Sequence, residues 1–194
     1  MKFFLNAFLV FAILGFPSQG LTTPITYTAN LYGPSESPPN ASPGTGFAMV
    51  VIDTAAHTLS VHADFSGLLG TTTAAHIHAA TALPLTGTAG VATQTPSFFG
   101  FPLGVTSGTY DNTFDLTLDS SWNPAFITAH GGPAGAEAFL DAALAEGMAY
   151  FNIHSNLFTP GEIRGFLVPA PATLLLFGTG LAGLAGIRLR RKKQ

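Results

Sequence analysis

TGFAMVVIDTAAHTLSVHADF, residues 45–65, gives the clearest indication of the fold. Two runs of alternating apolar and polar residues, 45–52 and 59–65, flank the turn-like segment 53–58, as the strands of a β-hairpin would. The second run has one apolar and one polar face, and its apolar members are Leu59, Val61, Ala63 and Phe65. An apolar strand face has to be covered, so this stretch predicts an antiparallel sheet packed over a core.

The same alternation recurs on both sides of this hairpin. It is seen at residues 25–31, 113–118, 149–153 and 163–167. Residues 134–146 differ, because they are rich in Ala and place apolar side chains at helical spacing behind Pro133, which suits the first helical position. We therefore predict a mainly β fold: a single antiparallel β-sandwich with one short helix.

Composition and charge exclude several classes of protein. The 194 residues suffice for one domain, and there is no Cys, which rules out disulfides and thiolate metal sites. All ten acidic residues lie in the middle of the chain, where Arg164 is the single cation, so this part carries a net charge of −9. Such a body repels phosphate backbones, and we expect no nucleic-acid partner. No Lys lies in the body and no Gly-x-Ser-x-Gly pattern occurs, so no catalytic constellation is recognised.

The N-terminus has the layout of a secretory signal peptide. Residues 1–20 contain one Lys, then an apolar run, then small residues at Ser18 and Gly20. Signal peptidase is expected to cut after Gly20, which leaves a body at residues 21–167. A permanent N-terminal anchor is the alternative, and Asn6 and Pro17 make it the less favoured one.

The C-terminus predicts a single membrane helix. Residues 172–187 carry no charge and span about 24 Å as a helix, and the side chains that follow extend the segment to about residue 189. Five basic residues close the chain: Arg188, Arg190, Arg191, Lys192 and Lys193. A basic cluster directly behind an apolar helix stays in the cytoplasm, which argues against a buried core helix.

These last residues, 168–194, resemble the PEP-CTERM sorting signal of Gram-negative bacteria: a short Pro motif, one membrane helix and an Arg-rich tail. The motif consists of Val168, Pro169, Ala170 and Pro171, and Ala170 stands where the family usually has Glu. The resemblance implies export to the cell envelope, the cell surface or the extracellular matrix. It also implies a single-pass membrane anchor before processing, and an exosortase as the processing partner.

The body resembles the CHRD domain, first described in chordin. Residues 148–169, MAYFNIHSNLFTPGEIRGFLVP, carry the family's closing signature. The matching residues are Tyr150, Asn152, His154, Ser155, Pro160, Gly161, Glu162, Ile163, Arg164 and Gly165, whereas Phe166 departs from the usual Gln. His76-Ile77-His78 is similar to the family's upstream His-Ile-His element. The resemblance spans about residues 25–167 and implies an immunoglobulin-like or superoxide-dismutase-like β-sandwich.

Three histidines form a candidate metal site. His76 and His78 point to the same side of a strand, and His154 joins them if its strand lies alongside. Three imidazoles can ligate copper or zinc, and because the ligands must be neutral, binding should weaken below the ordinary His pKa of ~6.5. The alternative is that these rings only hydrogen-bond loop backbones. Arg164, the single cation of the body, is expected to serve as a structural hub for ion pairs or hydrogen bonds.

Two functions follow from these features. The leading interpretation is an exported, non-enzymatic interaction module of the surface or matrix, tethered to the membrane and processed by an exosortase, with exopolysaccharide or envelope proteins as partners. The rival is a metal-binding β-sandwich, redox-active if copper is bound, that uses His76, His78 and His154.

Overall fold

The computed structural model describes residues 23–170. The predicted signal peptide, the predicted membrane helix at 172–189 and the basic cluster that ends in Lys193 lie outside this range. Within it the fold is mainly β, as predicted. The strands are β1 (Ile25–Tyr32), β2 (Thr45–Asp53), β3 (Thr58–Ser66), β4 (Thr72–His78), β5 (Gly108–Asp115), β6 (Tyr150–Ser155), β7 (Ile163–Phe166) and β8 (Val168–Pro169).

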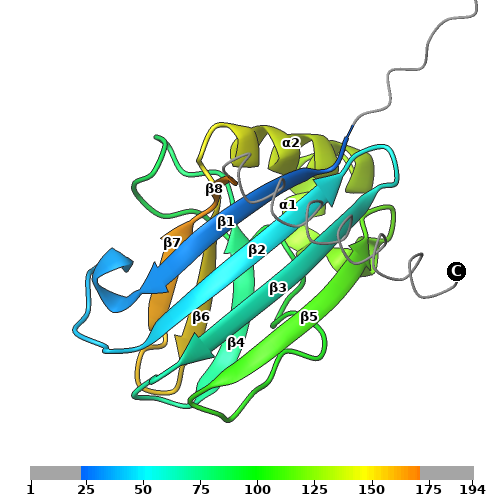
Figure 1. Cartoon of the computed structure of the whole chain (residues 1–194). Helices are drawn as coiled ribbons and strands as arrows, with labels where there is room; N and C mark the ends of the chain where they lie inside the picture. Colours follow the sequence, from blue (N-terminus) through cyan, green and yellow to red (C-terminus); the bar gives the residue numbers. More distant parts are fainter. Residues whose placement is uncertain (1–22, 171–194) are drawn as a thin grey trace, which may run out of the picture.

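All strands belong to one open, curled antiparallel sheet in the order β4-β6-β7-β1-β2-β3-β5, with β8 paired to β1 (Figure 1). This differs from the predicted sandwich of two separate sheets. The reason lies in β1, which pairs with β8 near its start and reaches β7 through a single pair at its end, Tyr32 with Arg164. One pair suffices to join the two halves of the sheet while leaving the sheet free to curl.

The predicted hairpin at 45–65 is present as β2 and β3, paired from Thr45–Ser66 to Asp53–Thr58. Its apolar face is buried as predicted: Leu59, Val61, Ala63 and Phe65 are each at most 4% exposed. Aromatic contacts connect this half of the sheet to the other. The ring of Phe98, in the segment between β4 and β5, lies 5.3 Å from Phe114 on β5 and 5.8 Å from Phe151 on β6.

Two α-helices pack at the end of the sheet where β1 begins (Figure 1). The predicted helix at 134–146 is α2 (Pro133–Ala145), which buries Leu140 and Leu144 completely. Helix α1 (Pro124–Ala129) was not predicted from the sequence, because six residues are too few to show a periodic pattern. Asn123 caps α1 by accepting a hydrogen bond from the Ala125 N–H. Short 3-10 turns, η1 (Gly33–Ser35) and η2 (Asp119–Ser121), complete the elements.

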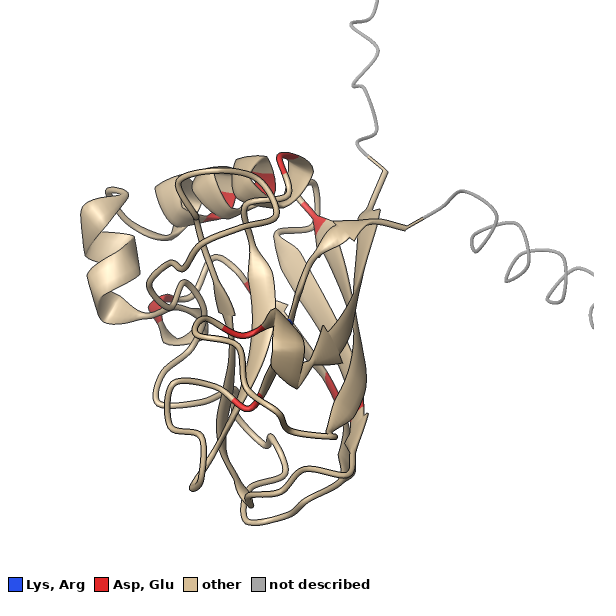
Figure 2. Cartoon of the chain, turned by 90° about the vertical axis from the view of Figure 1, so that its left-hand side faces the viewer, with Lys and Arg blue, Asp and Glu red and all other residues tan. Residues whose placement is uncertain are grey.

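Acidic positions are spread over the helices, loops and strands of the domain (Figure 2). Within residues 23–170, no helix has the length and apolar character needed to cross a membrane.

Candidate metal centre

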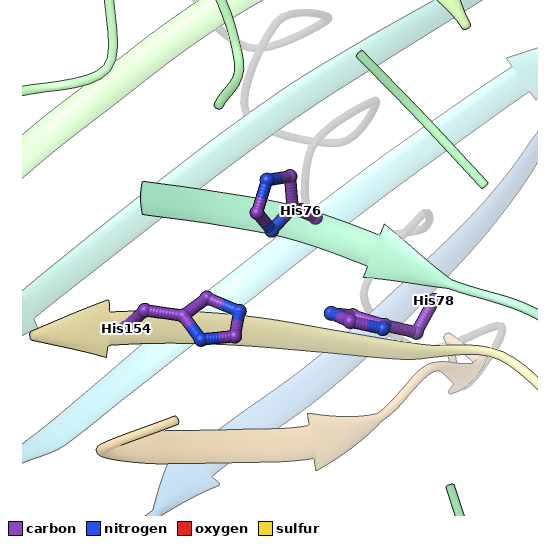
Figure 3. A group of neighbouring side chains, drawn as sticks. All are labelled: His76, His78 and His154. Atoms are coloured by element: carbon purple, nitrogen blue, oxygen red, sulfur yellow. The ribbon is translucent and has the colours of Figure 1, made fainter. Parts of the chain in front are cut away.

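The pairing of β4 with β6 brings the three predicted histidines together. In this antiparallel pair Ala74 lies opposite His154, and His78 opposite Tyr150. Side chains alternate along each strand, so His76, His78 and His154 share one face of the sheet (Figure 3). The other face of the same strands belongs to the core, where Ile77 and Ile153 are fully buried.

The three imidazoles lie close together; those of His76 and His78 are buried and that of His154 is half-buried. Each offers one nitrogen, and these three nitrogens lie within 4.8 Å of one another. The ring centroids of His76 and His154 are 5.2 Å apart, and that of His78 lies 5.7 Å and 5.9 Å from them. His76 is 6% exposed and His78 is 8% exposed. The arrangement is therefore a compact cluster of donors beneath the surface.

Each ring uses one nitrogen to contact a backbone carbonyl. The pairs are His76 Nε2 with Pro96 O (2.6 Å), His78 Nδ1 with Ala89 O (2.9 Å) and His154 Nδ1 with Thr159 O (2.9 Å). A carbonyl only accepts, so each of these nitrogens carries the proton and donates it. Backbone carbonyls are common outer partners of histidines that ligate metals, because they set the tautomer and aim the ring.

The remaining nitrogen of each ring is a buried lone pair with no partner. These atoms are His76 Nδ1, His78 Nε2 and His154 Nε2. A buried acceptor without a partner costs about 1–3 kcal/mol, and the chain leaves three of them side by side. The alternative, that these rings only hydrogen-bond loop backbones, explains one nitrogen of each ring. It does not explain the other nitrogen.

The environment keeps the rings uncharged. Burial lowers the pKa of His76 and of His78 to about 4, and it also lowers the pKa of His154. For the first two rings, protons therefore compete for the free nitrogens near pH 4, below the ~6.5 expected from the ordinary pKa. The difference arises because burial disfavours the protonated ring, which the sequence could not show.

Arg164 lies next to this cluster and is buried at 5% exposure. Its side chain donates to Ser35 O and to Gly87 O (3.1 Å), and its Nε lies 3.8 Å from a carboxylate oxygen of Glu36. The guanidinium also lies 4.8 Å from the ring centre of Tyr150, which stacks on His78 with 4.7 Å between centroids. These contacts fit the expected hub. The partner Glu36 was missed, because nothing in the sequence relates it to a residue so far along the chain.

Glu162 belongs to the same closing signature as Arg164 but makes different contacts. It precedes β7 and has partners that Arg164 does not share, accepting from Ser42 Oγ (2.7 Å) and from the N–H groups of Leu69 and Gly70. Burial alone would raise the pKa of Glu162, but hydrogen bonding to Ser155 together with these contacts outweighs it and lowers the pKa below its usual range. Glu162 therefore holds the β3–β4 loop to the start of β7.

The glycines of the signature allow close approaches. Gly161 has a φ of 141°, and a Cβ there would lie 2.5 Å from the amide of Asn152 and 2.6 Å from Glu36 Oε1. Asn152 in turn donates to the carbonyl of Pro160 (3.4 Å). A Cβ at Gly165 would lie 2.2 Å from Asn30 O on β1. Side chains larger than hydrogen are excluded at both positions.

A family model for the CHRD domain matches residues 27–167, which include all of these positions. The chain belongs to the CHRD domain family. A second model, for the PEP-CTERM protein-sorting motif, matches residues 167–192. No curated protein and no solved structure matches the chain.

The sorting motif begins where the CHRD domain ends. Val168 and Pro169 form β8, which pairs with Thr28 and Tyr27 of β1. The Ala170 N–H donates to the Thr26 carbonyl of the same strand (2.8 Å). Pro171 and the rest of the signal lie outside the described residues. The motif marks the protein for export and envelope anchoring in Gram-negative bacteria and for processing by exosortase-type machinery.

The other histidines of the CHRD domain do not join the centre. His57, in the β2–β3 turn, contacts Glu137 on α2 at 2.8 Å. His62 contacts two carboxylates on the outer sheet face, 2.8 and 3.0 Å away. His130 packs against the ring of Phe139, with 3.9 Å between centroids. Among residues 23–170, the one group that could hold a metal ion is His76, His78 and His154.

Proposed function

We propose that this protein is an exported metal-binding protein of the Gram-negative envelope, whose CHRD domain holds one metal ion through His76, His78 and His154. Residues 1–20 act as the signal peptide. A membrane helix at about 172–189 tethers the protein until an exosortase acts at the motif around residues 168–171. The observation that carries the metal function is the set of three buried imidazole nitrogens that face one another without a partner.

A cation would satisfy all three lone pairs at once. The rings are neutral, and each is oriented by a backbone carbonyl, which are the two conditions that a metal-binding histidine requires. The ligand set suits copper or zinc, because both accept imidazole nitrogen. The proposed role is binding rather than catalysis, since no nucleophile or acid–base pair among residues 23–170 is recognised beside the cluster.

The test is the metal content of the protein, produced without an affinity tag and purified in detergent. Variants are chosen to keep the outer hydrogen bonds: His76→Gln retains an N–H near Nε2, and His78→Asn retains one near Nδ1. We expect about one equivalent of copper or zinc in the wild type and a loss of at least 90% of it in the double variant. His130→Gln, outside the cluster, is the control and should retain the metal. Metal below ~0.1 equivalents in the wild type, or unchanged in the double variant, would refute the function.

An interaction module is the second candidate, and the exposed loops at one end of the domain favour it. Leu69, Leu103 and Leu157 are each more than half exposed and lie in three neighbouring loops. Two backbone hydrogen bonds connect these loops, Thr72 N–H to the carbonyl at 105 (2.8 Å) and the N–H at 156 to the carbonyl at 71 (3.0 Å). The loops lie at the opposite end of the sheet from β8 (Figure 1). Their sequences place no charged side chain at the surface.

An uncharged apolar end suits an envelope protein with an apolar patch better than an exopolysaccharide. Fractionation of cells that export residues 1–170, without the tail, would test this. The released domain should stay with the envelope through these loops, and the variant Leu69→Ser, Leu103→Ser, Leu157→Ser should move to the soluble fraction. A wild-type domain that is already soluble would contradict this candidate.

A further inference from the structure

The proposed metal centre contains no negative charge. Its donors are three neutral imidazoles, and no carboxylate among residues 23–170 joins the group. The outer partners are also uncharged, because all three ring N–H groups are donated to backbone carbonyls. Zinc-bound histidines often donate instead to carboxylates, which share the charge of a divalent ion. No ligand or outer partner of this centre therefore neutralises the positive charge of a bound ion.

The free energy lost when an ion is buried rises with the square of its charge. The solvation energy that an ion loses on burial is about four times greater for a divalent than for a monovalent ion of the same size. The nearest cation adds to the cost, because the Arg164 guanidinium lies 4.8 Å from the ring centre of Tyr150, which stacks on His78. Glu36 lies 3.8 Å from the Arg164 Nε and offsets the guanidinium only in part, because burial raises the pKa of Glu36 to about 7. The electrostatics of the site thus favour the ion of lowest charge.

The number of donors points in the same direction. Zn²⁺ takes four ligands, and where a protein supplies three, the fourth position is open to water. Here the three free nitrogens are buried beneath the segment that carries Ala89 and Pro96, whose carbonyls contact His78 and His76. Cu(I), a closed-shell ion, is stable with three nitrogen donors and requires no water.

The geometry requires only a modest closure. Three nitrogens arranged around an ion at ~2.0 Å are about 3.5 Å apart, so those within 4.8 Å must move together by at most about 1.3 Å. Thiolate ligands would ordinarily select Cu(I), but this chain has no Cys, and charge and coordination number make the selection instead.

The geometry points to Cu(I), bound by His76, His78 and His154 in a three-coordinate site, as the metal of this centre in preference to Zn²⁺ and Cu²⁺. This inference rests on the proposed metal function and specifies the ion and its oxidation state.

The experiment is a set of three titrations on the full chain, purified in detergent and freed of metal. Cu(I) is added without oxygen in competition with a chromogenic Cu(I) chelator, and Zn²⁺ and Cu²⁺ are added in competition with chelators suited to each. We expect one equivalent of Cu(I), with a Kd at least about 100-fold lower than for either divalent ion. The double variant His76→Gln, His78→Asn should weaken Cu(I) binding by at least about 100-fold, and His130→Gln should not change it.

The outcomes separate the two proposals. One equivalent of Zn²⁺ or Cu²⁺ bound as tightly as Cu(I) overturns the choice of Cu(I) and leaves the metal function intact. Failure of all three ions to bind overturns both. Cu(I) binding that survives in the double variant also overturns the inference, because the ion would then lie elsewhere.

Discussion

Replacing Glu36 by Gln should make folding stability less sensitive to alkaline pH. The Glu36 carboxyl group is buried at 6% exposure, and its Oε1 has no hydrogen-bond partner. Burial raises the pKa of Glu36 to about 7, although the Arg164 guanidinium 3.8 Å away pulls the pKa in the other direction. The fold therefore prefers the protonated acid, which Gln imitates.

The sign of the effect follows from the raised pKa. The stability that the protonated group contributes is fully present below the ordinary pKa of 4.5 and is lost as the pH rises through about 7. At ~1.36 kcal/mol per pH unit this interval sets a ceiling of ~3 kcal/mol, and solvent screening in the loop that carries Glu36 lowers the expected value to about 2 kcal/mol. The Glu36→Gln variant has no such loss.

Urea unfolding of wild type and Glu36→Gln at pH 5 and pH 8.5 measures the difference. We expect the free energy of unfolding of the variant, relative to wild type, to rise by about 2 kcal/mol between the two pH values. Glu146→Gln, which removes an exposed carboxylate, is the matched control and should leave the difference constant. Parallel profiles for wild type and Glu36→Gln would contradict the raised pKa of Glu36, because they would show that the buried acid does not titrate in this interval.

Three further substitutions test the contacts around the centre. Glu162→Gln should lower the free energy of unfolding by about 3 kcal/mol, because the N–H groups of Leu69 and Gly70 lose a charged acceptor; an unchanged urea midpoint would contradict this. Gly161→Ala should cost at least about 2 kcal/mol, seen as a lower melting temperature, since the φ of 141° and the close neighbours both disfavour a Cβ; equal melting temperatures would argue against that packing. Phe98→Ala should cost about 3–5 kcal/mol by calorimetry, because its ring connects the two halves of the sheet, and a loss below 1 kcal/mol would show that it does not.

The local elements of the fold could be predicted from sequence because each has its own period. The alternation at 59–65 and the helical spacing within 134–146 are short-range patterns, and both correspond to elements of the structure. The closure of the sheet is a long-range property. It depends on the pairing of Tyr32 with Arg164, 132 residues later, and no periodicity indicates which strands meet or whether one sheet or two result.

The candidate site could likewise be predicted from the sequence only in part. The face shared by His76 and His78 follows from their spacing, whereas the approach of His154 depends on the pairing of β4 with β6. The outer partners could not be predicted, because they are backbone carbonyls of loops, and a carbonyl is present at every residue. The lowered pKa values have the same origin, since burial by those loops causes them.

X-ray absorption of the copper-loaded chain shows whether three imidazoles hold one ion. We expect three nitrogen neighbours at about 2.0 Å with the outer scattering of three imidazole rings, and the ring contribution should fall to two in His154→Asn, which keeps the N–H that contacts the Thr159 carbonyl. Fewer than three imidazoles in the wild type, or a spectrum that His154→Asn leaves unchanged, would contradict a centre built from His76, His78 and His154.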